Sequence, residues 1–282
     1  MRRPWPSKRS SRTMIWKGTR VAFPRMEIRA PTRGNRRLEA LFEAANRDSR
    51  LHAWWHMQQV NADRLDMSDH SWVHIQIVVN IALRLFRLLN RAGVEPVMVT
   101  EHEMGRRDAE LVITAACLFH DTGMSIHRND HEQYSLFLAA DRLPLLLEGI
   151  YEEPELTIVT SEALHAVIGH RRRGGEPLTL EAGVVRVADA LDMASGRSRV
   201  PFETRRPNIH SLSAAAIDAV TIEPGEERTV RIEIAMNNSS GLFQVDELLA
   251  TKLRGSGIEE HFEVVARIEA EHEKRLVPVF RI

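Results

Sequence analysis

The sequence predicts a mainly helical protein, with a helical bundle followed by a small α+β domain. From residue 37 to about residue 219, apolar residues recur at the spacing typical of buried or amphipathic helices. After residue 220 the spacing changes, and Val230, Ile232, Ile234 and Met236 alternate with Arg231 and Glu233 as in a half-buried strand. Helical spacing returns in Gly241 to Leu253, and Phe262 to Ile268 again favours a strand. These patterns predict domains over residues 37–219 and 220–282.

Residues 1–36 are expected to form a basic, disordered leader. Between Met1 and Arg25 there is no acidic residue, and there are eight basic ones: Arg2, Arg3, Lys8, Arg9, Arg12, Lys17, Arg20 and Arg25. The rest of the chain holds 30 basic and 39 acidic residues. Broad binding to nucleic acid needs clustered positive charge, so the acidic body argues against such a partner. Only the leader could dock on nucleic acid, and we interpret it as disordered instead.

The chain is expected to be cytoplasmic, with no membrane span. The longest apolar run, Trp72 to Leu89, is interrupted by polar residues: His74, Gln76, Asn80, Arg84 and Arg87. The first residues lack the continuous apolar core of a secretory signal. The single cysteine, Cys117, excludes an intramolecular disulfide, and its apolar surroundings predict a packing residue. Since two-fold oligomers are the commonest, a homodimer is the default expectation.

The adjacent pair His120 and Asp121 is the most informative feature of the sequence. It ends the apolar run Ala109 to Phe119, for which Asp108 is the predicted N-cap, and it is followed by Gly123 after one residue. At a helix end the backbone can turn, so adjacent side chains can point at a common position. An imidazole and a carboxylate in that arrangement suit a metal ion.

Two further ionisable residues lie in segments that are predicted to be buried helices. His74 lies in Trp72 to Leu89, and Asp189 lies in Gly183 to Met193. A buried charge is costly unless it is paired or bound to a metal. Together with His120 and Asp121, these residues can complete one metal site.

Two more histidines allow a second ion. His131 begins a predicted helix over residues 131–140, and His170 ends one over residues 161–170, for which Thr160 or Ser161 is the expected N-cap. Mixed imidazole and carboxylate ligands favour manganese, iron, cobalt, nickel or zinc over magnesium or calcium. With these additional ligands, one or two ions can bind, and Asp121 can bridge them.

The order His74, His120 and Asp121, then Asp189 resembles the HD-domain superfamily of metal-dependent phosphohydrolases. His131 and His170 resemble the additional ligands of its two-metal branch. The resemblance extends to the residues around the motif: Asp69 to His74, Ala115 to Gly123, and Ala188 to Asp192. It implies an HD-type bundle and an enzyme that cleaves a phosphate monoester, nucleotide or phosphodiester with a metal-activated water. It also selects His74 over His70, which lies one turn earlier, and Asp189 over Asp192, which is expected to orient a ligand. His127 and His165 are reserve ligands.

One departure from the family concerns the charge that holds the substrate phosphate. Many members carry a lysine directly after the glycine of the doublet motif, where this chain has Met124. Arginines could replace it, because their guanidinium groups match phosphate oxygens. The candidates follow His170 and the Asp189 helix: Arg171, Arg172, Arg173, Arg197 and Arg199. The segment after His170 also lacks the Gly-Tyr-Pro signature of the cyclic-di-GMP branch, so that substrate is not assigned.

Met124 also motivates an alternative function. The protein could be a regulatory module that binds a metal or a nucleotide and has lost turnover. The C-terminal domain would then act as a sensor or a dimerisation element.

Overall fold

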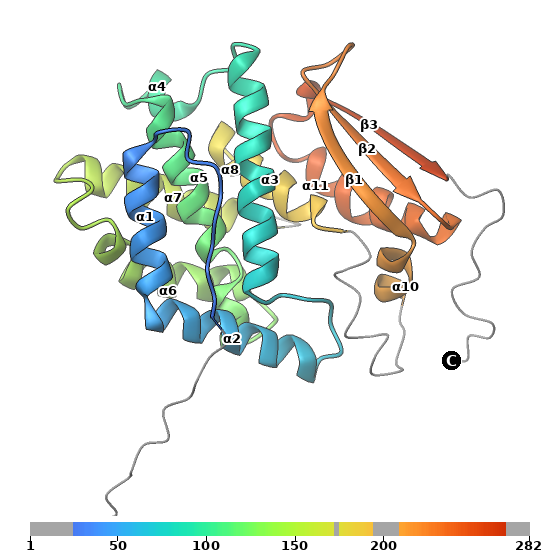
Figure 1. The fold of residues 1–282 in the computed structure, drawn as a ribbon, viewed down its shortest axis with the longest axis horizontal. Coiled ribbons are helices and arrows are strands. Elements are labelled where there is room, and N and C mark those ends of the chain that lie inside the picture. The colour runs from blue at the N-terminus through green and yellow to red at the C-terminus, as the bar shows by residue number, and fades with distance from the viewer. Residues whose placement is uncertain (1–24, 172–174, 194–208, 269–282) are drawn as a thin grey trace, which may run out of the picture.

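The computed structural model describes residues 25–171, 175–193 and 209–268. Its first part is helical, with α1 (Arg36–Arg47), α2 (Ser49–Arg64), α3 (Trp72–Arg91), α4 (Val97–Thr100), α5 (Arg106–Phe119), η1 (Thr122–Ser125), α6 (His131–Leu146), α7 (Glu155–Gly169) and α8 (Leu180–Leu191). The C-terminal part has α10 (Ile209–Ala215), β1 (Ile217–Pro224), β2 (Val230–Met236), η3 (Ser239–Gly241), η4 (Gln244–Ala250), α11 (Thr251–Leu253), η5 (Glu259–His261) and β3 (Phe262–Ile268). Figure 1 shows the helices gathered beside a small sheet. The predicted fold class is confirmed.

Helix α5 forms the centre of the helical part. All of its residues from Asp108 to Phe119 are buried, and it contacts α1, α3, α6, α7 and α8. A helix that is apolar on every side is stable only when neighbours surround it. Among the described helices, α3 alone is long and apolar enough to cross a membrane, but it packs against α5 and α8, which explains its apolar character. The end of α5 therefore places His120 deep inside the molecule.

The C-terminal sheet has the strand order β1-β2-β3, with β1 antiparallel and β3 parallel to β2. In β2 every second side chain is buried, as its alternating sequence predicts. The sequence did not predict β1, because only Ile217 and Ile222 of its side chains are buried and the alternation is lost. Its start at Ile217 corrects the expected helical pattern up to residue 219.

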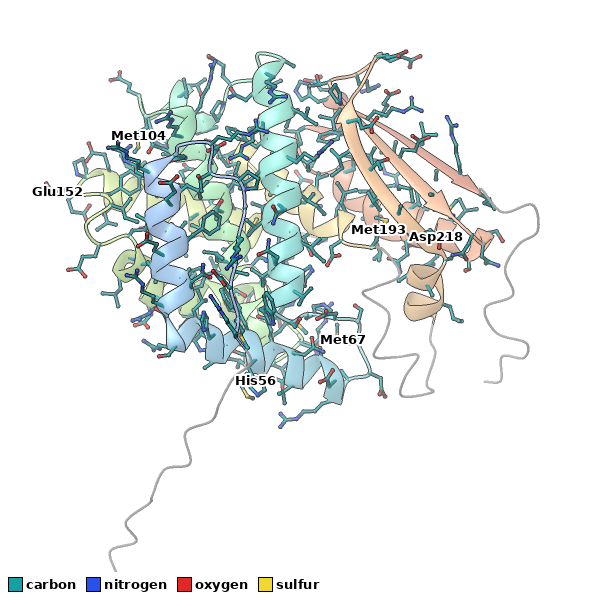
Figure 2. All side chains as sticks on the ribbon, in the orientation of Figure 1. His56, Met67, Met104, Glu152, Met193 and Asp218 are labelled. Carbon is teal, nitrogen blue, oxygen red and sulfur yellow. The ribbon has the colours of Figure 1, made fainter. Side chains whose placement is uncertain are left out.

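The two parts of the chain are in direct contact. Helix α3 contacts β1 and β2, while α8 contacts η4 and α11 (Figure 1). Figure 2 shows side chains filling the space between the helices and the sheet, with Met193 at the junction, where it is buried. The division into domains at residue 220 stays a prediction.

Two predicted helix starts are wrong. Helix α5 begins at Arg106, and Asp108 lies inside its first turn, where the carboxylate accepts a hydrogen bond from the Gly105 amide. Helix α7 begins at Glu155, so Thr160 and Ser161 lie within it, and the Ser161 hydroxyl donates to the Thr157 carbonyl. In both cases the helix begins earlier in the sequence than the residue that could have capped it.

The end of the predicted leader is also corrected. Met26 and Ile28 are buried in the helical core, and the Asn46 side chain hydrogen-bonds both the amide and the carbonyl of Ile28. Residues 25–35 are therefore part of the packed structure, although the segment is too short to show a period in the sequence. Residues 1–24 lie outside the described part of the chain.

Candidate metal centre

The structure brings the six predicted ligands together from five helices. His74 lies on α3, Asp189 lies on α8, and His120 and Asp121 lie at the end of α5. The remaining two are His131 at the start of α6 and His170 at the end of α7. All six residues are buried. Buried polar groups need polar partners, and these residues are partners for one another.

One set of ligand atoms surrounds the Oδ2 atom of Asp121. This oxygen lies 3.4 Å from His74 Nε2 and 3.5 Å from His120 Nε2. The two imidazole nitrogens are 3.1 Å apart. Asp189 lies beside this group, because its Oδ1 atom is 3.4 Å from His74 Nε2 and 3.7 Å from His120 Nε2. Atoms bonded to a metal at about 2.1 Å lie roughly 3 to 3.5 Å from one another, so the group of His74, His120 and Asp121 fits one ion, with Asp189 next to it.

The second set surrounds the other oxygen of Asp121. Its Oδ1 atom lies 3.1 Å from His131 Nε2 and 3.9 Å from His170 Nε2. Asp121, His131 and His170 thus form a second compact group of possible ligand atoms. The carboxylate of Asp121 faces one group with each oxygen, which is the arrangement of a bridging ligand.

The imidazoles are oriented by hydrogen bonds at their Nδ1 atoms. The acceptors are Asp192 for His74 (2.6 Å), the Cys117 carbonyl for His120 (2.8 Å) and the Val167 carbonyl for His170 (2.5 Å). His131 Nδ1 lies 2.8 Å from the donor Arg128 Nη1 and 3.1 Å from the Arg128 carbonyl. A ring that donates through Nδ1 leaves the Nε2 lone pair for a metal. Asp192 therefore takes the predicted role of orienting a ligand, here His74.

Gly123 allows the doublet to approach α6. A Cβ atom at this position would lie 1.9 Å from the His131 carbonyl oxygen. The Gly123 amide donates to the Ser135 hydroxyl (2.8 Å), which in turn donates to the His120 carbonyl (2.7 Å). The missing side chain thus lets the first turn of α6 bring His131 to Asp121.

The electrostatics of the centre suit metal binding. Burial opposes ionisation of Asp121, but the His120, His131 and His74 imidazoles outweigh it and hold the carboxyl pKa well below its usual range. Burial, followed by the proximity of His120 and Lys252, lowers the pKa of His170. Metal ligands must be ionised carboxylates and neutral imidazoles, and these shifts favour the ionised form of Asp121 and the neutral form of His170.

Lys252 is a residue of the centre that the sequence analysis did not find. It lies on α11, and its ammonium group donates to Asp189 Oδ2, the oxygen that does not face the imidazoles. Burial opposes ionisation of Asp189, but Lys252 and then the imidazoles hold the carboxyl pKa well below its usual range. A lone lysine after a helical run gives no signal in the sequence, because it is indistinguishable from a solvated surface residue.

Close contact between α8 and the C-terminal part places Lys252. The Arg186 Nε atom donates to the Lys252 carbonyl (3.0 Å). At Gly183 a Cβ atom would lie 2.4 Å from the Ser256 carbonyl oxygen, so the glycine permits the approach. The ammonium group of Lys252, which lies far from His120 and Asp121 in the sequence, is therefore brought to Asp189.

Arg171 is the one proposed phosphate-binding arginine that the structure describes. Met124 is buried in the core, and Arg171 pairs with Asp130 at 3.3 Å, beside the start of α6. Arg172, Arg173, Arg197 and Arg199 lie outside the described residues. Within the described residues, the reserve histidines are not part of either ligand group; these are His70, His127 and His165.

Cys117 illustrates how tightly this region is packed. Its thiol is fully buried on α5, and burial raises its pKa. We expect it to remain unlabelled by a thiol-specific reagent at pH 8, because both access and the reactive thiolate are suppressed. The denatured chain is the control and should be labelled fully in the same time. Rapid labelling of the native protein would contradict the packing around the doublet.

Comparison with known proteins agrees with this geometry. The model of the HD domain matches residues 68–194, a range that contains all six ligand residues. An uncharacterised protein of Methanocaldococcus jannaschii, MJ1020, is 35% identical over 232 residues, which are 82% of this chain and 89% of that protein. The likeness extends beyond the segment matched by the HD domain. The chain therefore belongs to the HD-domain superfamily of metal-dependent phosphohydrolases.

Proposed function

We propose that this protein is an active phosphohydrolase that holds two divalent transition-metal ions and cleaves a phosphate ester. The observation that carries the proposal is Asp121, whose two oxygens face two groups of ligand atoms. His74, His120, Asp121 and Asp189 would hold one ion, and Asp121, His131 and His170 would hold the other. Manganese, iron, cobalt, nickel and zinc suit this mixture of nitrogen and oxygen donors.

The expected substrate is a phosphorylated small molecule or a nucleotide. Bound divalent ions supply Lewis acidity and lower the pKa of the water that attacks phosphorus. The chain's own contribution is to fix the geometry, through the buried imidazoles and the hydrogen bonds at their Nδ1 atoms. Lys252 adds a positive charge beside Asp189, where it would attract phosphate oxygens. It thereby supplies the cation that Met124 does not.

The proposal is tested by metal content and hydrolysis of the full chain purified without chelator. We expect about two ions per chain and hydrolysis of at least one member of a panel of monoesters, nucleotides and phosphodiesters, tested with manganese, iron, cobalt, nickel and zinc. Treatment with a chelator should abolish turnover, and the metal should restore it. Bound metal without hydrolysis of any panel member would favour the regulatory alternative. If no metal binds after reconstitution, both metal-dependent hydrolysis and a metal-binding regulatory function are rejected.

Replacing Lys252 by methionine is expected to lower turnover by about 10-fold to 100-fold, because outer partners of metal ligands have effects of this size. Methionine keeps an unbranched side chain, one atom shorter, and removes the charge. The measurement is the hydrolysis rate together with metal per chain. Arg254→Met, two residues further along and exposed, is the matched control and should retain the rate. Unchanged turnover in Lys252→Met would remove this lysine from the mechanism.

A further inference from the structure

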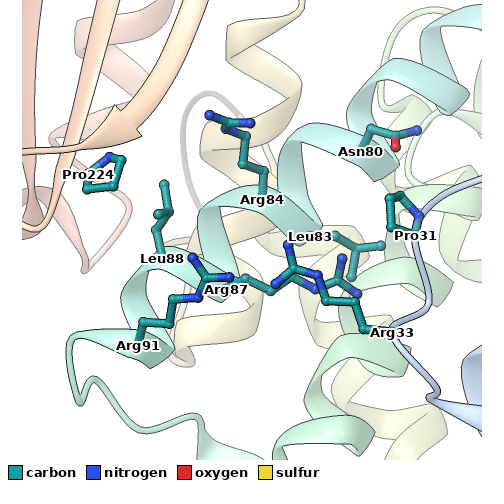
Figure 3. Close-up of a pocket in the computed structure, with 9 residues that line it drawn as sticks. All are labelled: Pro31, Arg33, Asn80, Leu83, Arg84, Arg87, Leu88, Arg91 and Pro224. Carbon is teal, nitrogen blue, oxygen red and sulfur yellow. The ribbon is translucent and has the colours of Figure 1, made fainter.

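A cavity of about 360 Å³ lies near the C-terminal end of α3. The segment before α1 and the end of β1 close its sides, through Pro31 and Pro224. Leu83 and Leu88 of α3 add apolar surface, as Figure 3 shows. The cavity therefore joins three segments that are far apart in the sequence.

Four arginines line this cavity: Arg33, Arg84, Arg87 and Arg91. Figure 3 shows the side chains of Arg33, Arg87 and Arg91 extending toward one another. Arg87 pairs with Glu110, at 2.6 Å between Nε and Oε1. Within the described residues, Arg33, Arg84 and Arg91 make no ion pair with an acidic side chain, so positive charge exceeds negative charge here. Like charges held together repel one another unless an anion joins them.

Arg87 carries a donor that the protein leaves unsatisfied. Its side chain is 10% exposed, and its Nη2 atom is buried without a hydrogen-bond partner. Glu110 is already engaged, because its second oxygen accepts from the Asn35 amide at 3.0 Å. A buried unsatisfied donor on a charged group is costly, so an acceptor from a ligand would stabilise the site.

We propose that this cavity binds a small ligand that carries two or more phosphate groups. Guanidinium groups match phosphate oxygens in planar, paired hydrogen bonds, and several arginines can serve a chain of phosphates. The volume is within the range of pockets for small molecules, and the leucines offer an apolar wall beside the charges. Sulfate-sized anions would engage only part of this set.

The cavity is separate from the metal centre. Arg87 follows His74 by 13 residues on α3, which corresponds to roughly 20 Å along a helix. A ligand held by Arg87 and Arg91 therefore does not reach the ions proposed above. It would instead connect α3 with the end of β1 and so stabilise the docking of the sheet.

The test is calorimetric titration of the full chain with methylenediphosphonate, whose P–C–P bridge resists hydrolysis. We expect a binding event, besides any at the metal centre, that weakens at least tenfold in Arg84→Ala and in Arg91→Ala, and that also weakens as salt is raised. Both arginines are exposed, so the fold should survive their removal. Arg84 also donates to the Ile222 carbonyl of β1 at 2.6 Å, so Arg91→Ala separates loss of binding from loss of that contact. Arg47→Ala, at the far end of α1, is the control and should bind as the wild type does. The metal centre is identical in all four proteins, so it cannot produce the difference.

A second titration uses adenosine 5′-(α,β-methylene)diphosphate. Tighter binding than that of the diphosphonate would show that the apolar wall takes a base, whereas equal binding would show that the phosphates alone are recognised. Either result supports the site if the arginine variants weaken it. Undetectable binding to the wild type, or equal affinity in Arg84→Ala and Arg91→Ala, would overturn the proposal. Because binding is measured without turnover, this result is independent of the proposed hydrolase activity.

Discussion

Replacement of Asp121 by alanine is expected to remove both metal ions and to lower turnover by roughly three orders of magnitude or more, the equivalent of several kcal/mol of transition-state stabilisation. The reason is that Asp121 is the only one of the six ligands that faces both groups of ligand atoms. Elemental analysis of the purified variant measures the loss of metal, and hydrolysis of the best substrate of the panel measures the loss of turnover.

Two other variants separate the roles of the two ligand groups. His131→Ala should lose the second ion and keep the first, because its Nε2 atom faces Asp121 Oδ1 and belongs to the second ligand group and not to the first. Asp192→Ala should keep both ions with weaker affinity, since it acts through the His74 ring. If Asp121→Ala retains metal and full activity, the bridged arrangement is wrong.

Replacement of Gly123 by alanine is expected to destabilise the fold by about 3 kcal/mol, the upper part of the usual range for overpacking. The added Cβ would lie 1.9 Å from the His131 carbonyl oxygen and 2.5 Å from the Ser135 amide nitrogen. Both are backbone atoms of the first turns of α6, so relief requires the helix to move. Urea denaturation followed by circular dichroism measures the loss, and metal content should fall as His131 moves away from Asp121.

Gly169→Ala is the matched control, since this glycine lies directly before His170 as Gly123 lies shortly after Asp121. The nearest atoms to its Cβ would be the Ala182 methyl group at 3.3 Å and atoms of Pro177 at 3.7 Å. Alanine also favours a helix over glycine by about 1 kcal/mol, so stability should be nearly unchanged. A Gly123→Ala variant as stable as this control would show that α6 does not depend on the close approach.

The candidate ligand set could be recognised in the sequence because its members interrupt the apolar pattern of the segments around them. His74, His120, Asp121 and Asp189 are ionisable residues in apolar segments, and their burial is explained only by a shared partner. His131 and His170 were added as histidines at the ends of predicted helices, and the family resemblance agreed with them. Helix ends were less predictable, because Asp108 and Thr160 can cap a helix but their neighbours allow the helix to extend further.

Lys252 and the arginine cavity could not be predicted, for a different physical reason. Each depends on how the C-terminal part docks: Lys252 reaches Asp189 from α11, and the cavity needs Pro224 at the end of β1. The C-terminal part docks where the two surfaces fit closely, as at Gly183. Such a fit produces no periodic pattern or motif in the sequence. The same applies to β1, whose buried face is set by its position against α3.

Because Lys252 contacts Asp189, the metal centre depends on a residue outside the HD domain. The HD match ends at residue 194, yet one oxygen of Asp189 is held by a residue more than fifty positions further along the chain. A chain cut after residue 194 would keep all six ligands but would lose the cation that balances one of them. Transplanting the matched segment alone into another protein would therefore transfer the ligands without the charge balance that they have here.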